Sequence, residues 1–113
     1  MSKYNTITVW NAVYGDRPEA TDYAGRLMKK SACGNPNSAY HPTLDHIRPL
    51  SMGGADVPEN IIICHRDTNE EKADCFPHWK TNHFRFHAIR VRGSRNAYEI
   101  IEDNDMNPKR KGN

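Results

Sequence analysis

Apolar positions along this chain occur in short runs, each bounded by glycine, proline or asparagine. The run Thr6–Tyr14, TITVWNAVY, is β-branched and aromatic, and its periodicity fits either a strand or a short helix. Turn-forming residues, Gly-Asp-Arg-Pro, end it at 15–18. A mild amphipathic pattern predicts a helix over 23–28 from propensity alone, and residues 34–38 predict a loop.

The middle of the chain predicts two strands joined by a loop. Residues 43–47 predict the first strand, which Pro49 ends because proline cannot donate to a ladder. The loop over 51–59 contains a Gly-Gly pair that permits positive φ. Residues 60–64 predict the second strand, and its three consecutive isoleucines indicate burial on both faces.

A short helix is predicted directly after the second strand. Thr68 and Glu71 have the spacing of a capping box, with the threonine at the cap and the glutamate at the third helical position. Asp67 is a competing cap residue. Pro77 limits this helix to about two turns.

The C-terminal third predicts two more strands, over 84–91 and 96–102, joined by an Arg-Gly-Ser-Arg turn. Residues 103–113 contain no apolar side chain except Met106 and predict a flexible basic tail. Together these elements predict one small α+β domain over residues 1–102.

Length and composition limit the classes of protein that are possible. With 113 residues, 36% of them apolar and 27% charged, the chain has enough material for one small core. Its longest apolar run, at 61–64, is far too short to cross a bilayer, and the N-terminal segment lacks the apolar centre of a signal peptide. We therefore expect an intracellular, cytoplasmic protein with no membrane partner. The net charge of +2 is too small to indicate nucleic-acid binding by itself.

The cysteines Cys33, Cys64 and Cys75 are odd in number, and in a reducing compartment we expect buried thiols rather than disulfides. Three residues either side of Cys33 stand Lys30 and Pro36, where a second zinc-binding cysteine would be needed. A tetrahedral zinc site requires four good donors. We therefore expect no structural zinc.

Five polar residues occur at a characteristic spacing. The pair Asp45-His46 is followed after thirteen residues by Asn60, after eight more by Asn69, and after two more by Lys72. Each residue alone has an ordinary explanation as a surface, turn or helix-terminal side chain. The set is informative because all five positions occur in register around one predicted strand–loop–strand–helix unit.

This order and spacing resemble the HNH nuclease family, also called the ββα-metal fold, and in particular the HNH domain of RNA-guided CRISPR effector nucleases. Pro49 and the pair Gly53-Gly54 match the wider family of small HNH proteins. The resemblance implies a ββα-metal core over 43–76 with an additional C-terminal β-hairpin, in an HNN-type variant without the zinc-binding cysteine pairs. It also implies extended structure, rather than a helix, over 23–28.

Phosphodiester hydrolysis needs a base for the attacking water and a cation at the phosphate. The neutral imidazole of His46 can accept a proton at physiological pH. Asp45 and Asn69 offer oxygen donors, which suit a hard cation such as Mg²⁺ or Mn²⁺. The resemblance implies that His46 is the general base and that Asp45 and Asn69 bind the metal. It implies that Asn60 supports the loop through side-chain to backbone hydrogen bonds.

Several basic residues are expected to meet nucleic acid. Lys72 lies three residues after Asn69 on the predicted helix, over the same face, where it can contact phosphate. Arg90 and Arg92 occur in the predicted hairpin among aromatic residues, which fits either a DNA-contacting face or ordinary sheet packing. His65 is expected to support the residues of the site, to face DNA, or to be a plain exposed histidine.

These observations lead to the expectation of a divalent-metal-dependent endonuclease that hydrolyses DNA. A single site cuts one strand, so a double-strand break requires a homodimer or two visits. Two alternatives remain open: a catalytically weak DNA-binding or packaging accessory protein of the same fold, and a toxin-type ribonuclease.

Overall fold

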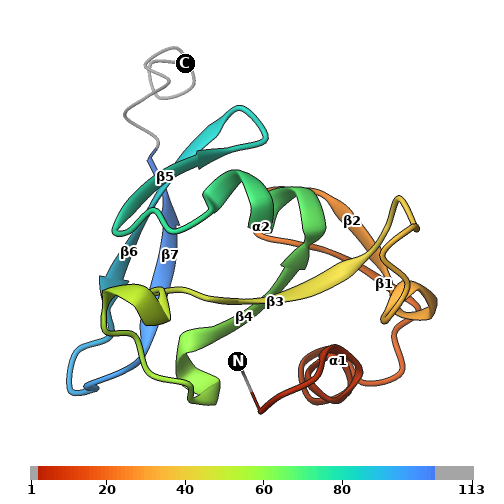
Figure 1. Ribbon diagram of the computed structural model, residues 1–113, viewed down its shortest axis with the longest axis horizontal. Coiled ribbons are helices and arrows are strands. Elements are labelled where there is room, and N and C mark those ends of the chain that lie inside the picture. Colours follow the sequence, from red (N-terminus) through yellow and green to blue (C-terminus); the bar gives the residue numbers. More distant parts are fainter. Residues whose placement is uncertain (1–2, 104–113) are drawn as a thin grey trace, which may run out of the picture.

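The computed structural model describes residues 3–103, so residues 104–113 of the predicted tail lie outside the described part (Figure 1). This part is an α+β domain with two α-helices and three separate antiparallel sheets. Neither helix within residues 3–103 is long and apolar enough to span a bilayer.

The first apolar run forms a helix, α1 (Thr6–Tyr14), which settles the choice that periodicity left open. The side chain of Asn5 accepts a hydrogen bond from the Thr8 backbone N–H at 3.0 Å, and so caps the first turn. Gly15, with φ of 61°, ends the helix. The side chain of Trp10, on the inner face of this helix, is fully buried and donates its indole N–H to the Arg17 carbonyl at 3.0 Å.

The helix predicted from propensity over 23–28 is wrong: residues 23–26 form a hairpin turn, and the extended structure implied by the family resemblance forms only from residue 27. Strands β1 (Glu19–Thr21) and β2 (Leu27–Lys29) pair as an antiparallel hairpin. Asp22 accounts for the difference, because its Oδ1 accepts the backbone N–H groups of residues 24 and 26, each at 2.9 Å. That side chain stabilises a turn, which propensity scales do not capture.

The centre of the chain is a strand pair followed at once by a helix. Strand β3 (Pro42–His46) pairs antiparallel with β4 (Ile61–His65), and α2 (Arg66–Lys72) follows without a linker (Figure 1). Two short 3₁₀ turns, η2 (Leu50–Met52) and η3 (Pro58–Asn60), lie in the loop between the strands. Both strands lie within one residue of their predicted bounds.

The start of α2 differs from the predicted capping box. The cap is His65, whose Nδ1 accepts the Asp67 backbone N–H at 2.9 Å. Thr68, the predicted cap, is fully buried inside the helix, and its hydroxyl accepts a hydrogen bond from Arg26 Nη1 at 3.0 Å. The prediction failed because a histidine at the end of a strand is an unusual cap, whereas Thr-x-x-Glu is a common one.

The C-terminal strands form a three-stranded sheet rather than an isolated hairpin. The two predicted strands occur as β6 (Phe84–Arg90) and β7 (Tyr98–Glu102), and an additional strand, β5 (His78–Thr81), pairs with β6. The order is β5-β6-β7. Strand β5 has only four residues and directly follows a proline, so its alternating pattern is too short to stand out in the sequence.

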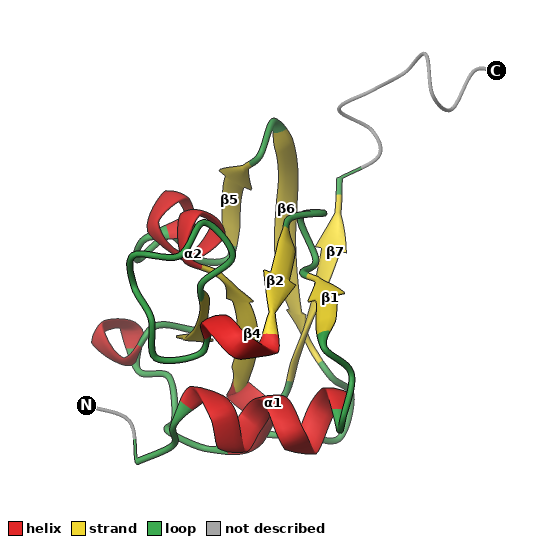
Figure 2. Ribbon diagram, turned by 90° about the vertical axis from the view of Figure 1, so that its right-hand side faces the viewer, coloured by secondary structure: helices red, strands yellow, loops and turns green. Residues whose placement is uncertain are grey.

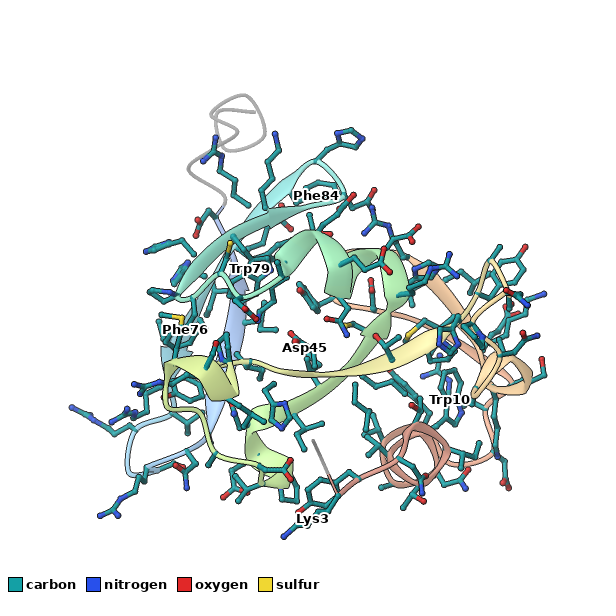
Figure 3. The ribbon with its side chains drawn as sticks, in the orientation of Figure 1. Lys3, Trp10, Asp45, Phe76, Trp79 and Phe84 are labelled. Carbon is teal, nitrogen blue, oxygen red and sulfur yellow. The ribbon has the colours of Figure 1, made fainter. Side chains whose placement is uncertain are left out.

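Two buried clusters flank the centre of the domain. One joins the three-stranded sheet to the end of β3 and the β1–β2 turn, and consists of Ala24, Ile47, Trp79, Phe86 and Ala88. The other lies where α1 meets β1, β2 and β4, and consists of Trp10, Ala20, Met28 and Ile63. Figure 2 shows α1 running across one end of the molecule, and Figure 3 shows Asp45 between the two clusters, marked by Trp79 and Trp10.

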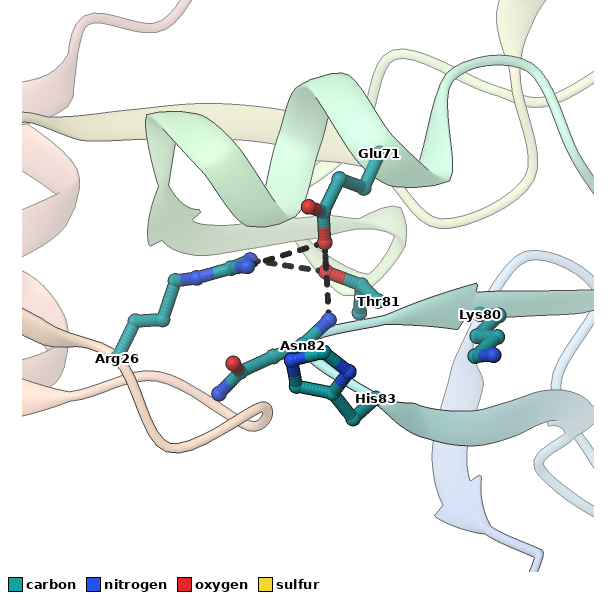
Figure 4. A pocket seen from close by; sticks show the side chains of 6 residues that line it. All are labelled: Arg26, Glu71, Lys80, Thr81, Asn82 and His83. Atoms are coloured by element: carbon teal, nitrogen blue, oxygen red, sulfur yellow. Dashed lines mark hydrogen bonds and ion pairs between the residues drawn. The ribbon is translucent and has the colours of Figure 1, made fainter.

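A polar network fixes α2 against both hairpins. Glu71 reaches from α2 towards Arg26, Thr81 and Asn82 (Figure 4). Its Oε1 accepts the Thr81 hydroxyl at 2.7 Å, the Asn82 backbone N–H at 2.9 Å and Arg26 Nη2 at 3.0 Å. These hydrogen bonds, that of Thr81 foremost, lower the pKa of Glu71 from 4.5 to about 2.

This network predicts a pH dependence of stability. Because the pKa of Glu71 is lower in the folded state, its stabilising contribution is present above pH 4.5 and is lost as pH falls towards about 2. In Glu71→Gln, the free energy of unfolding should therefore fall less steeply over that interval than in the wild type. Urea denaturation across this pH range measures both slopes. The exposed neighbour Glu70 provides the control, since Glu70→Gln should keep the wild-type slope.

Candidate active site

Asp45 lies at the end of β3 with its carboxylate directed into the protein. Its side chain is 12% exposed, and its Oδ2 lies 3.1 Å from Lys72 Nζ. Burial raises the pKa of Asp45, and the charge of Lys72 opposes that rise. The buried Oδ2 therefore has the Lys72 ammonium group as its partner, through both charge and a hydrogen bond. A carboxylate also offers the hard oxygen donors that suit a divalent cation.

Asn69, in the middle of α2, is held against the same strand. Its Nδ2 donates to Thr43 Oγ1 at 2.9 Å and to the Leu44 carbonyl at 3.2 Å. These bonds use both amide protons and leave Oδ1 as an oxygen donor beside the strand that carries Asp45. One carboxylate and one amide oxygen fit Mg²⁺ or Mn²⁺, which keep several water ligands. Residues 3–103 contain no group of three or more His, Cys, Asp or Glu placed to hold a metal.

His46, next to Asp45, has a partner that the sequence did not reveal. Its Nε2 lies 2.8 Å from Oδ1 of Asp56, and the two side chains are 16% and 26% exposed. An ionised carboxylate can only accept, so Nε2 donates to Asp56 in this pair, and in the neutral imidazole the lone pair is on Nδ1. Asp56 lies in the long loop ten residues after His46, and its spacing gives no signal of this contact.

Asn60 is fully buried and joins the end of β3 to the following loop. Its Oδ1 accepts the Arg48 backbone N–H at 2.9 Å, and its Nδ2 donates to the carbonyls of Arg48 at 3.1 Å and Ala55 at 2.9 Å. Gly54 lies against this cluster, where an added Cβ would come within 1.8 Å of the Arg48 carbonyl oxygen. Only glycine fits there.

Lys72 and His65, both expected to meet nucleic acid, are buried, and this corrects the expectation. Lys72 is fully buried, with its Nζ on Asp45, 3.3 Å from the His46 carbonyl and 5.1 Å from the centroid of the Trp79 ring. Besides capping α2, His65 places its Nε2 2.7 Å from the carbonyl of residue 39. Neither side chain is available to a phosphate in this structure.

Arg90 and Arg92 lie at the end of β6 and in the turn that follows it, and both are exposed. Arg90 Nη2 donates to the Tyr98 hydroxyl at 3.3 Å, as does Nη1 of Arg48 at 3.3 Å. Arg48 is a second residue that spacing did not single out. A contact of Arg90 or Arg92 with DNA stays a prediction.

The three cysteines are free, with Cys33 half-buried and Cys64 buried, but Cys75 is exposed, so the expectation of a buried thiol is wrong for Cys75. Burial raises the pKa of the Cys64 thiol, as expected for a core cysteine. Cys33 packs against the α1 cluster. Hydrogen bonds hold the loop after Cys33 to α2, because Arg66 Nη1 donates to the carbonyls of residues 36 and 38 at 2.8 and 3.0 Å.

Comparison with known proteins gave one family. Residues 36–78 match a family model described as HNH endonuclease. Comparisons with curated proteins and with solved structures each gave no match. The match confirms the resemblance recognised in the sequence and supports nuclease activity in general. The matched segment contains all five residues of the spaced set: Asp45, His46, Asn60, Asn69 and Lys72.

Proposed function

We propose, from the HNH endonuclease sequence that residues 36–78 carry, that this chain is a divalent-metal-dependent endonuclease hydrolysing phosphodiester bonds in DNA. In this proposal β3, β4 and α2 are the ββα-metal core, and the three-stranded sheet is an addition to it. The observation that carries the proposal is that Asp45, paired with Lys72 and adjacent to His46, lies on the same strand to which the Asn69 amide is hydrogen-bonded.

Asp45 and Asn69 would hold the metal through their side-chain oxygens. When bound, a divalent cation polarises the phosphate and stabilises the negative charge on the leaving 3′-oxygen. Lys72 acts on this site from inside the protein. Its ammonium group favours the ionised form of the buried Asp45 carboxylate and so keeps it available as a ligand.

His46 would take the proton from the attacking water at Nδ1 as the water oxygen forms its bond to phosphorus and the 3′-oxygen leaves. Asp56 is a positioning residue in this step. It accepts the Nε2 proton, fixes the ring orientation and stabilises the imidazolium that forms. The role of His46 as base is implied by the family resemblance, and the role of Asp56 is proposed from its contact with Nε2.

DNA is proposed over RNA on the strength of the family resemblance. Incubating the protein in parallel with supercoiled DNA and with structured RNA, each with Mg²⁺, separates the proposal from its alternatives. Selective cleavage of RNA would favour the toxin-type ribonuclease, and binding of DNA without cleavage would favour the accessory protein. Because one site cuts one strand, we expect one nick per encounter of a single chain with DNA.

Loss of a metal ligand should be rescued by excess metal. In Asn69→Ala the concentration of Mg²⁺ for half-maximal cleavage should rise by at least about tenfold, with much of the rate restored at saturation. Water can replace a lost ligand, which is why saturation helps. Cleavage rate measured against Mg²⁺ and Mn²⁺ concentration tests this, with Asn69→Asp as the control that keeps an oxygen donor. A rate that stays low at all metal concentrations would contradict the ligand role.

Asp45 needs a different design, because its removal leaves the buried ammonium of Lys72 uncompensated. Asp45→Ala alone should lower stability by about 3–5 kcal/mol. The double variant Asp45→Ala, Lys72→Met removes both charges and should recover much of that stability while metal affinity stays low. Comparing the two variants in urea denaturation and metal titration separates the structural effect from the ligand effect.

A further inference from the structure

We propose that Arg48, Tyr98 and Arg90 form a binding site for a second phosphodiester group of the substrate strand, next to the phosphate that is cleaved. This proposal rests on the proposed nuclease function and names a substrate contact beyond the metal site. It assigns Arg48 and Tyr98 a role, and it gives Arg90 a defined partner.

The three side chains meet at one point. The guanidinium groups of Arg48 and Arg90 approach the same phenolic oxygen, each donating to Tyr98 at 3.3 Å. Arg90 also lies over the Tyr98 ring at 5.8 Å, and Arg48 lies over the Phe76 ring at 5.8 Å. The rings of Phe76 and Tyr98 pack edge to face at 5.4 Å. The two guanidinium groups therefore lie against the packed rings of Phe76 and Tyr98.

This convergence leaves positive charge uncompensated. Within residues 3–103 neither Arg48 nor Arg90 forms an ion pair, and the two guanidiniums repel each other. Burial raises the pKa of Tyr98, but hydrogen bonds from Arg48 and Arg90 outweigh it, so the pKa lies below its usual value. An anion with several oxygens can accept from both arginines at once, and guanidinium geometry matches phosphate well.

Arg48 is fixed close to the proposed base. It lies two residues after His46, and the side chain between them, Ile47, is buried in the core. Strand β3 ends at His46, and the Arg48 side chain leaves the bend that follows and reaches Tyr98 and the Phe76 ring. Asn60 holds the backbone of Arg48 at both its N–H and its carbonyl, and Arg48 Nε donates to the Met52 carbonyl at 2.8 Å.

The position favours a nucleic-acid backbone over a small free anion. Arg48 lies two residues along the chain from His46, and Arg92, which is exposed, lies two residues along the chain from Arg90. A polyanion can contact these positions together, whereas an isolated phosphate can occupy only one. Both a nucleic-acid backbone and free inorganic phosphate present a phosphate group, and the experiment below distinguishes these two ligands.

The test measures DNA affinity without cleavage. Fluorescence anisotropy of a labelled duplex, with Mg²⁺ present and in the His46→Ala background, gives Kd as a function of salt. Arg90→Gln and Arg48→Gln should each weaken binding about tenfold at fixed salt and lower the slope of log K against log salt by about 1. Tyr98→Phe keeps the ring and removes the hydroxyl that orients both guanidiniums, and should weaken binding less.

Arg85 provides the matched control. It lies on the same strand, β6, and is exposed, but it points to the opposite face of the sheet from Arg90. Arg85→Gln removes the same charge and should leave both Kd and the salt slope at wild-type values. Thermal melting confirms that each variant is folded. Arg48→Gln removes the hydrogen bond to the Met52 carbonyl and can disturb the η2 turn, but Arg90 is exposed, so Arg90→Gln still tests the site without that effect.

The proposal is overturned if Arg90→Gln behaves like Arg85→Gln. It is also overturned if inorganic phosphate binds at the cluster by calorimetry while duplex affinity is unchanged in both arginine variants, which would identify a small-anion site. If binding depends on Arg90 but the protein with an intact His46 does not cleave DNA, the result would support this site and refute the nuclease function. Cleavage without any dependence of binding on Arg48 or Arg90 would do the reverse.

Discussion

Replacing His46 by alanine should lower kcat for DNA cleavage by about 10²–10⁴-fold, the usual contribution of a general base. The fold and the affinity for metal should stay close to wild type, because His46 contacts Asp56 and not the proposed metal ligands. Single-turnover nicking rates measure the first effect. Thermal melting and metal titration measure the second.

Variants of Asp56 provide the matched comparison. Asp56→Asn keeps an acceptor for the Nε2 proton but loses the charge, whereas Asp56→Ala loses both. We expect kcat to fall in the order wild type, Asp56→Asn, Asp56→Ala, His46→Ala. Cleavage by His46→Ala at the wild-type rate would show that another group activates the water, and the role of Asp56 would then fail with it.

Replacing Gly54 by alanine should destabilise the protein by about 3 kcal/mol or more. The new Cβ would lie 1.8 Å from the Arg48 carbonyl oxygen and 3.0 Å from Asn60 Nδ2. The backbone cannot yield easily, because Asn60 holds Arg48 and the Gly54 N–H itself donates to the Pro49 carbonyl at 3.0 Å. Urea denaturation measures the loss, and cleavage should fall because His46 and Arg48 shift with the loop.

Gly93 supplies the control for this experiment. Its φ is +84° and an added Cβ would meet nothing within 4 Å, so Gly93→Ala carries only the backbone cost of about 1–2 kcal/mol. The excess in Gly54→Ala is then attributable to contact with Arg48 and Asn60. Equal destabilisation of the two variants would mean that the loop is not packed against Asn60 as described.

Sequence pattern identified the central unit because its signals are local. The polar residues at 45, 46, 60 and 69 mark the ends of β3, β4 and the body of α2, and the strand bounds were predicted to within one residue. Spacing alone can reveal such a set, since strands and helices fix how far apart their ends lie.

The remaining parts depend on contacts between distant residues. Asp56 approaches His46 only because the loop folds back, and Arg48 and Arg90 meet at Tyr98 only because β7 lies beside both the segment after β3 and β6. Lys72 has the sequence context of a surface lysine, yet the Trp79 ring and the Asp45 carboxylate enclose it. Burial of a lysine in this way depends on the packed fold, so the hydrophobic periodicity of the sequence does not predict it.

The central claim, a metal-dependent endonuclease, is tested most directly by incubating the purified protein with supercoiled plasmid and either Mg²⁺ or EDTA. The account predicts that Mg²⁺ converts supercoiled plasmid to nicked circles, that EDTA abolishes the conversion, and that His46→Ala nearly abolishes it at any metal concentration. Plasmid that stays supercoiled with both Mg²⁺ and Mn²⁺, in a protein shown to be folded, would contradict it, as would nicking that continues unchanged in EDTA.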